Sequence, residues 1–199
     1  MTAQEFITAV EAGGTIEVDS DIDFNDYYFS STIVIPAGTI INGAGHTLTN
    51  IQQGSSNIIF QSSNCTLNNI NIRNLNIPNG TLFYSNNSVE FSANECQISG
   101  YIYRIHYGAN LGSYGAMTFN RCSLNINRYL DINATLRECY VVLENNIIKG
   151  STTSYNYFGY GVNTYYKGKL SNADGAITSS SNLNNCCIKI HTKANDKKI

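Results

Sequence analysis

The stretch Arg121-Cys122-Ser123-Leu124-Asn125-Ile126 decides the fold, because its first four positions recur along the chain. In each copy a polar residue is followed by a cysteine, a variable residue and an aliphatic residue. The other copies are residues 64–67, 95–98, 138–141 and 185–188. Because apolar and polar positions alternate with a period of two, each copy is typical of a β-strand with one buried face.

The spacing of the copies predicts a solenoid. Their cysteines are separated by 31, 26, 17 and 47 residues, and the last interval is about two of the shorter ones. A coil without cysteine fits into it around Tyr160, and an earlier coil at residues 45–48 fits the frame with His46 in the cysteine position. Other alternating strands precede or follow most copies. Short strands repeated every 20 to 30 residues or so predict a parallel β-helix.

The cysteines are expected to be structural. Stacked coils lie about 4.8 Å apart, so equivalent inward side chains form a ladder. Free cysteine behaves as a small, buried hydrophobe. The predicted inward ladder consists of Cys65, Cys96, Cys122, Cys139 and Cys186. Cys187 should face the other way. The Cys-x₂₋₄-Cys pairs of a zinc site do not occur, and we expect neither a metal nor a cofactor.

The residue before each cysteine should face outward. In three successive copies these residues alternate in charge, which predicts a surface column of Glu95, Arg121 and Glu138. Exposed ion pairs contribute only ~0–1 kcal/mol each, so such a column helps the coils to keep their register more than it adds stability. It also argues against reading these three residues as an active site.

The N-terminus is predicted to cover the open end of the solenoid. Thr2 and Glu5 have the spacing of a helix capping box. Phe6, Ile7 and Val10 then form an apolar face at helical spacing. The sequence thus predicts a capping helix at residues 1–14, a β-helix at residues 15–192 and a basic tail at residues 193–199. The fold class is all-β: a single-stranded, right-handed parallel β-helix with a short N-terminal capping α-helix.

Residues 1–50 resemble a known family. The resemblance rests on Phe6-Ile-Thr-Ala-Val10, Gly14-Thr-Ile-Glu-Val18, Ile33-Val-Ile-Pro-Ala-Gly38 and Ile41-Asn-Gly-Ala-Gly-His46. These segments are similar to the N-terminal portion of the pectate-lyase-like β-helix superfamily, and the later coils continue the pattern to about residue 190. The family includes pectin-degrading enzymes, phage tailspikes and other virion proteins. The resemblance therefore implies a fold and leaves the chemistry open.

The motifs of the family's enzymes are missing. Its polygalacturonases carry an Asp pair, Gly-His-Gly and Arg-x-Lys, and neither Asp-Asp nor the other two motifs occur in this chain. The acidic stretch at residues 19–26 resembles a calcium loop only superficially. Phe24 stands where an EF-hand needs glycine, and the bidentate glutamate is missing. We expect His46 to be buried and hydrogen-bonded, and His191 to lie too near the end for catalysis.

A lyase site remains an alternative. It would be assembled from charged residues on neighbouring coils: Glu95, Asp131, Glu138, Arg121, Arg128 and Arg137. The surface-column interpretation is favoured, and we assign no catalytic residue.

Tyrosine clusters suggest a contact surface. Tyrosine beside asparagine and arginine suits sugar rings, and equally suits a protein interface, where Tyr and Arg are enriched. The candidate residues for glycan or partner binding are Tyr101, Tyr103, Arg104, His106, Tyr107, Tyr155, Tyr157 and Tyr160.

Composition excludes several classes of partner. Net charge is −2 and only 13% of residues are charged, which gives no electrostatic footprint for nucleic acid or anionic lipid. No run approaches the ~20 apolar residues of a membrane helix. The first residues lack the features of a secretory signal, so we expect synthesis in a cytoplasm.

We therefore expect a non-enzymatic virion protein, such as a phage fibre, spike or decoration component. It would contact other virion proteins, further copies of itself as a homotrimer, or a host-surface glycan. The alternatives are a lyase or glycoside hydrolase acting on acidic polysaccharide, and a glycan-binding adhesin module.

Overall fold

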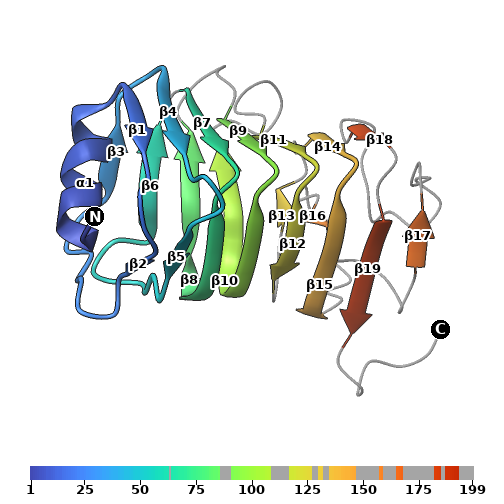
Figure 1. Ribbon diagram of the computed structural model, residues 1–199. Coiled ribbons are helices and arrows are strands. Elements are labelled where there is room, and N and C mark those ends of the chain that lie inside the picture. Colours follow the sequence, from blue (N-terminus) through green and yellow to red (C-terminus); the bar gives the residue numbers. More distant parts are fainter. Residues whose placement is uncertain are drawn as a thin grey trace.

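The computed structural model is a stack of β-coils closed at one end by a helix (Figure 1). It describes residues 1–62, 64–85, 91–108, 117–126, 130–131, 135–146, 157–158, 165–167, 182–184 and 187–192. The helix is α1 (Ala3–Ala12). The strands are β1 (Thr15–Glu17), β2 (Ile22–Asp23), β3 (Ile33–Ile35), β4 (Thr39–Asn42), β5 (Thr47–Thr49), β6 (Ile58–Ser62), β7 (Cys65–Asn68), β8 (Asn71–Ser85), β9 (Phe91–Asn94), β10 (Gln97–Gly108), β11 (Met117–Asn120), β12 (Ser123–Ile126), β13 (Leu130–Asp131), β14 (Thr135–Arg137), β15 (Tyr140–Asn146), β16 (Tyr157–Phe158), β17 (Tyr165–Lys167), β18 (Asn182–Asn184) and β19 (Cys187–Thr192).

The capping helix is confirmed. The Thr2 side chain accepts a hydrogen bond from the Glu5 backbone N–H, and the Glu5 carboxylate accepts one from the Thr2 N–H at 2.7 Å. These bonds lower the pKa of Glu5. Phe6, Ile7 and Val10 are buried, and the helix ends at Gly13, whose φ is 76°. The helix thus lays its apolar face over the first coils and covers their open end (Figure 1).

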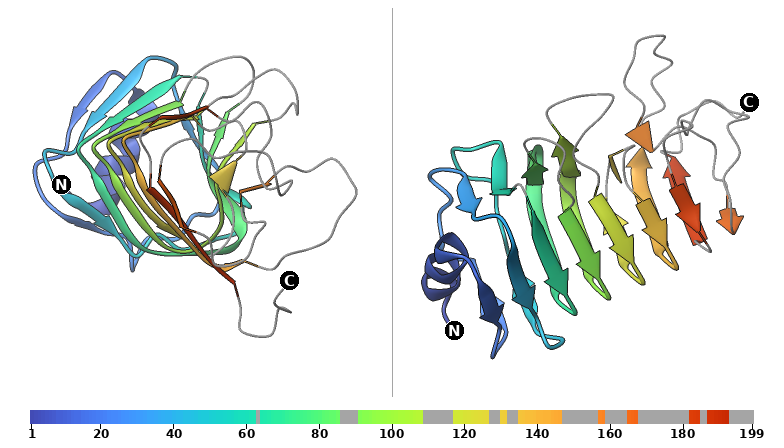
Figure 2. Two further views of the ribbon diagram at one scale, coloured as in Figure 1. Left: turned by 90° about the vertical axis from the view of Figure 1, so that its right-hand side faces the viewer. Right: turned by 90° about the horizontal axis from the view of Figure 1, so that it is seen from above.

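Each coil adds one strand to each of two parallel sheets. The first sheet has the order β1-β4-β7-β9-β11-β14-β18. The second runs β2-β5-β8-β10-β12-β15-β19, with β17 pairing antiparallel to β19. A third face is formed by β3, β6 and the C-terminal parts of β8 and β10. Viewed along the axis, the strands surround one interior (Figure 2). The protein is therefore a parallel β-solenoid, as the sequence predicts.

A single left-handed residue makes the corner between the first and second sheets. Asn69, Glu95, Arg121 and Glu138 stand at this corner with φ between 46° and 56°. Such a residue turns the chain sharply while the next side chain enters the core. Asparagine adopts this left-handed backbone conformation readily, whereas for most other residues with a Cβ it costs conformational energy.

Replacing Glu138 by asparagine should therefore raise the free energy of unfolding by roughly 1 kcal/mol, because it relieves left-handed strain. Urea denaturation measures the effect. Ser123→Asn in β12 is the control, because Ser123 is exposed and its φ is not positive. Equal stabilisation by the control, or destabilisation by Glu138→Asn, would contradict this explanation.

Three of the predicted ladder cysteines form one inward column. The Ser123 N–H donates to the Cys96 carbonyl, and the Tyr140 N–H donates to the Cys122 carbonyl, both at 2.9 Å. The Cys122 and Cys139 thiols each donate to a carbonyl of the preceding coil at 3.3 Å. Hydrogen bonding with Cys139 and Cys96, together with burial, raises the pKa of the Cys122 thiol. Cys96, Cys122 and Cys139 are buried free thiols, as predicted, whereas Cys186 lies outside the described residues.

The placement of Cys65 in that column is wrong. Cys65 is buried, and burial raises its pKa to about 12, but it opens β7 in the first sheet, opposite Thr39 and Phe91. Ile70 occupies the column position in this coil, 26 residues before Cys96, whereas Cys65 precedes Cys96 by 31. Side chains alternate between inward and outward in the strands of both sheets. A short alternating motif therefore predicts that its cysteine points inward, but it does not predict to which sheet the strand belongs.

His46 also differs from the prediction. Its carbonyl accepts the Asn71 N–H, which places its backbone in the column of Ile70. Its side chain, however, is 35% exposed and lies 3.3 Å from Asp21. This coil carries two extra residues at the corner, and Gly43 lies against Ile70, where a Cβ would approach within 2.4 Å of the Ile70 Cβ. The extra residues move the imidazole out of the core.

Candidate functional site

The third face carries the best candidate for a contact surface. Val34 on β3 is in register with Gln61 on β6, Gln61 with Tyr84 on β8, and Tyr84 with Tyr107 on β10. We call these four residues the third-face row. Val34 is 57% exposed, and Gln61 and Tyr84 are half-buried. Phe60 and Phe83, the residues before Gln61 and Tyr84, are buried, so alternation turns Gln61 and Tyr84 outward.

The structure places the predicted tyrosine cluster along β10. Tyr101 is opposite Asn76 and is 42% exposed. Tyr107 belongs to the third-face row by register, and Tyr103 lies between these two in the same strand. The backbones of Arg104 and His106 are in register with Thr81 and Phe83, whose side chains are buried.

The second tyrosine cluster is only partly described. Tyr157 lies in β16, which pairs antiparallel with β13, whereas Tyr155 and Tyr160 lie outside the described residues. Tyr28, 68% exposed, and Tyr140 add two exposed rings that the sequence pattern did not single out. The Tyr28 hydroxyl is hydrogen-bonded to that of Ser55 at 2.9 Å.

The charged column lies on the surface, as predicted. The Arg121 Nε donates to the Glu95 carboxylate at 3.0 Å. The Arg121 side chain is 60% exposed and the Glu95 side chain is 50% exposed. Glu95, and to a smaller extent Glu138, raises the pKa of the Arg121 guanidinium. All three residues occupy the left-handed corner. Arg121 neutralises Glu95 there, and each of the three residues defines the turn of its own coil.

The other described residues of the alternative lyase cluster lie in strands, and their backbones are not at the left-handed corner of this column. Asp131 lies in β13, opposite Tyr157. Arg137 lies in β14, opposite Asn120 in the first sheet. Arg128 lies outside the described residues.

Sequence reasoning missed an asparagine ladder along the edge of the first sheet. Asn68 donates through its side-chain amide to Asn42 Oδ1, Asn94 donates to Asn68, and Asn120 donates to Asn94, at 2.7–2.9 Å. Asn42 in turn donates to the Glu17 carboxylate at 2.7 Å. The chain of donors runs in one direction and ends on a group that only accepts. The signal was present, since these asparagines recur every 26 residues, one position before the corner.

The carboxylates of the acidic stretch, residues 19–26, accept hydrogen bonds from separate partners. Asp21 accepts the Thr47 backbone N–H at 2.8 Å, and Asp23 accepts the Asn50 side-chain amide at 2.9 Å. These bonds lower the pKa of both carboxyl groups. Within the described part of the chain, no three His, Cys, Asp or Glu side chains are placed to hold a metal ion.

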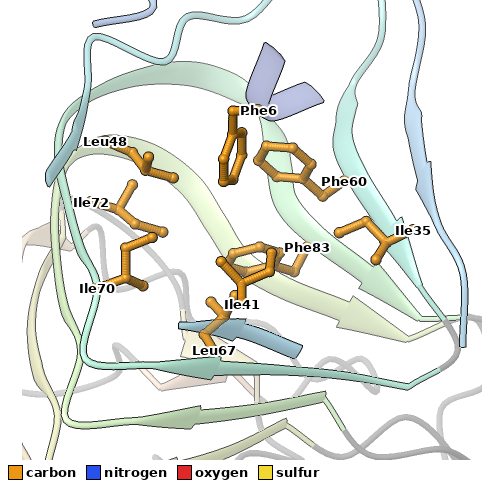
Figure 3. Close-up of a pocket in the computed structure, with 9 residues that line it drawn as sticks. All are labelled: Phe6, Ile35, Ile41, Leu48, Phe60, Leu67, Ile70, Ile72 and Phe83. Atoms are coloured by element: carbon orange, nitrogen blue, oxygen red, sulfur yellow. The ribbon is translucent and has the colours of Figure 1, made fainter. Parts of the chain in front are cut away.

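A small apolar cavity lies beneath α1 (Figure 3). Phe6 reaches into it from the helix, facing Phe60 and Phe83 (Figure 3). The volume of the cavity is about 10 Å³ and its walls are entirely hydrocarbon. A void of this size and character, with no polar partner for water, is a packing defect of the core.

No known protein family, curated protein or solved structure matches the chain. Among the described residues, no helix is long and apolar enough to cross a lipid bilayer. The geometry therefore identifies the fold as a parallel β-solenoid, and membership of the pectate-lyase-like superfamily stays a proposal.

Proposed function

We propose that this protein is a non-enzymatic structural or attachment component, which uses a rigid coil stack to present a contact face to a protein partner or a glycan. The observation that carries the proposal is the third-face row, in which Val34, Gln61, Tyr84 and Tyr107 follow one another on consecutive coils. Tyrosine brings a large apolar ring and a polar hydroxyl to an interface at low entropic cost.

The partners of the charged side chains support a structural role. Arg121 is paired with Glu95, Asp21 with a backbone amide and His46, and Asp23 with Asn50. Each of these groups links one coil to the next. A catalytic pair of carboxylates would instead face a common substrate.

The superfamily that residues 1–50 resemble includes tailspikes and other virion proteins, and we place this chain with those because the motifs of the family's enzymes are missing from its sequence. A spike or fibre of this kind would be a homotrimer and would meet either a neighbouring virion protein or a host-surface glycan. The adhesin alternative uses the same face, and a glycan array tests it.

Replacing Val34 by arginine should disrupt contacts made by this face. A charge placed within a packed interface costs at least about 1.4 kcal/mol, which is tenfold in affinity. We expect native mass spectrometry to show loss of the oligomer, or a glycan array to show at least tenfold weaker binding. Ser123→Arg, on the exposed face of β12, is the matched control. Unchanged assembly and binding in the Val34 variant would contradict the proposal.

The enzyme alternative is tested separately. The protein is incubated with acidic polysaccharides, with and without a chelator, and the release of products is measured. We expect no turnover. Turnover that is lost in Arg121→Ala or Glu138→Ala would overturn the non-enzymatic role.

A further inference from the structure

The chain contains two Asn-Gly dipeptides in different environments, Asn42-Gly43 and Asn79-Gly80. Asparagine followed by glycine is the pair most prone to spontaneous deamidation, because no side chain shields the glycine nitrogen. The reaction needs that nitrogen to reach the asparagine Cγ. A hydrogen bond that holds either group therefore slows the reaction.

At Asn42 both reacting groups are held. The Asn42 amide nitrogen donates to Glu17 at 2.7 Å, and its oxygen accepts from Asn68 at 2.9 Å. The Gly43 N–H donates to the Asn68 carbonyl at 2.7 Å. Reaction at this pair requires the asparagine ladder to open locally.

Asn79 lies between two paired segments of β8, next to the buried Gly80. In β8, Ile77 and Thr81 are paired with residues of β10, and Thr81 is also paired with β6. The three residues between them, Pro78, Asn79 and Gly80, take part in neither pairing. Asn79 is exposed. Its backbone N–H donates to Gln53 at 3.0 Å, and among the described contacts its side chain makes no hydrogen bond. A Cβ at Gly80 would lie 2.7 Å from the Asn57 carbonyl oxygen, so the close approach of the backbone requires glycine.

We propose that Asn79 is a site of spontaneous deamidation in the folded protein and that the asparagine ladder protects Asn42. The Gly80 nitrogen attacks the Asn79 Cγ, a C–N bond forms, and the Cγ–Nδ2 bond breaks. Ammonia leaves with the proton that the Gly80 nitrogen loses. Water then opens the succinimide ring to give aspartate or isoaspartate.

The product acts directly on the third face. Either product adds a negative charge at position 79. Isoaspartate also inserts one backbone methylene between residue 79 and Gly80, and the next residue is Thr81, whose N–H donates to the Asn57 carbonyl at 2.8 Å. Thr81 begins the part of β8 that carries Tyr84. Modification at Asn79 thus alters the start of the segment that presents Tyr84, one residue of the third-face row.

The test compares the two sites within one sample. The full chain is incubated in mildly alkaline buffer, digested, and mapped by mass spectrometry, with isoaspartate identified by methyltransferase labelling. In the folded protein we expect modification at Asn42 to be at least about tenfold slower than at Asn79, because it depends on local opening. In concentrated urea, where the ladder is gone, the two rates should become similar.

Two outcomes would overturn the proposal. One is an Asn79 that is stable in the folded protein while it reacts in urea. The other is an Asn42 that reacts as fast as Asn79 in the folded protein. Asn79→Ser is the assignment control: it should abolish the folded-state product and leave the reaction of Asn42 in urea unchanged. This result does not depend on the proposed contact function, which is measured by assembly and glycan binding.

Discussion

Replacing Phe29 by alanine should lower the free energy of unfolding by about 3–5 kcal/mol, the range for a fully buried phenylalanine. Phe29 joins the first coil to the second. Its ring lies 4.8 Å from that of Tyr27, 5.8 Å from that of Phe24 and 6.0 Å from that of Phe60, between ring centroids. The aromatic column continues from Phe24 to Phe6 in the capping helix. Truncation at Phe29 therefore opens a cavity between the helix-capped end and the rest of the stack.

The neighbouring residue provides a matched control. Tyr28 is 68% exposed and its hydroxyl bonds to Ser55, so Tyr28→Ala removes a ring of similar size from the same loop. Its expected cost is below about 1 kcal/mol, as for other surface substitutions. Urea denaturation measures both variants. Equal losses would mean that the interior aromatic column does not hold the first two coils together.

The capping helix and the strand alternation were predictable because they depend on local chemistry. A capping box satisfies amides three residues apart, and the apolar face of α1 has a helical period. Burial of Cys96, Cys122 and Cys139 followed from the same logic, since alternation fixes which residues point inward.

Register was harder to predict, because it depends on the corner between the sheets. Cys65 has the same four-residue motif as Cys96 but precedes the corner, and the motif by itself does not distinguish the two positions. His46 follows a corner with two extra residues, and the imidazole consequently leaves the core. The left-handed φ of Glu95 and Arg121 was also unexpected, because neither residue type favours that region.

The candidate contact face could be predicted only in part. The sequence singled out Tyr107, but its neighbours in the third-face row, Val34, Gln61 and Tyr84, come from strands of other coils. These residues share no motif with Tyr107. Only the inter-coil register brings them together, and register is a property of the whole stack.

Replacing Asn94 by alanine should cost about 2–3 kcal/mol, because it interrupts the asparagine ladder in the middle. The Asn68 Oδ1 loses its donor and the Asn120 amide loses its acceptor, and both groups are half-buried. Leaving a partly buried polar group unsatisfied costs about 1–3 kcal/mol. Ser92→Ala is the control, since Ser92 is half-buried in the same strand, faces outward, and makes no ladder bond.

The direction of the ladder gives a sharper test. Aspartate at position 94 can accept from Asn120 but has no donor for Asn68, so Asn94→Asp should lose about half as much stability as Asn94→Ala. Urea denaturation above the carboxyl pKa range measures this difference. Equal losses in the two variants would show that the asparagines act through packing alone. An intermediate loss would show that each coil is held in register by an amide donated to the coil before it, a chain that ends on the Glu17 carboxylate.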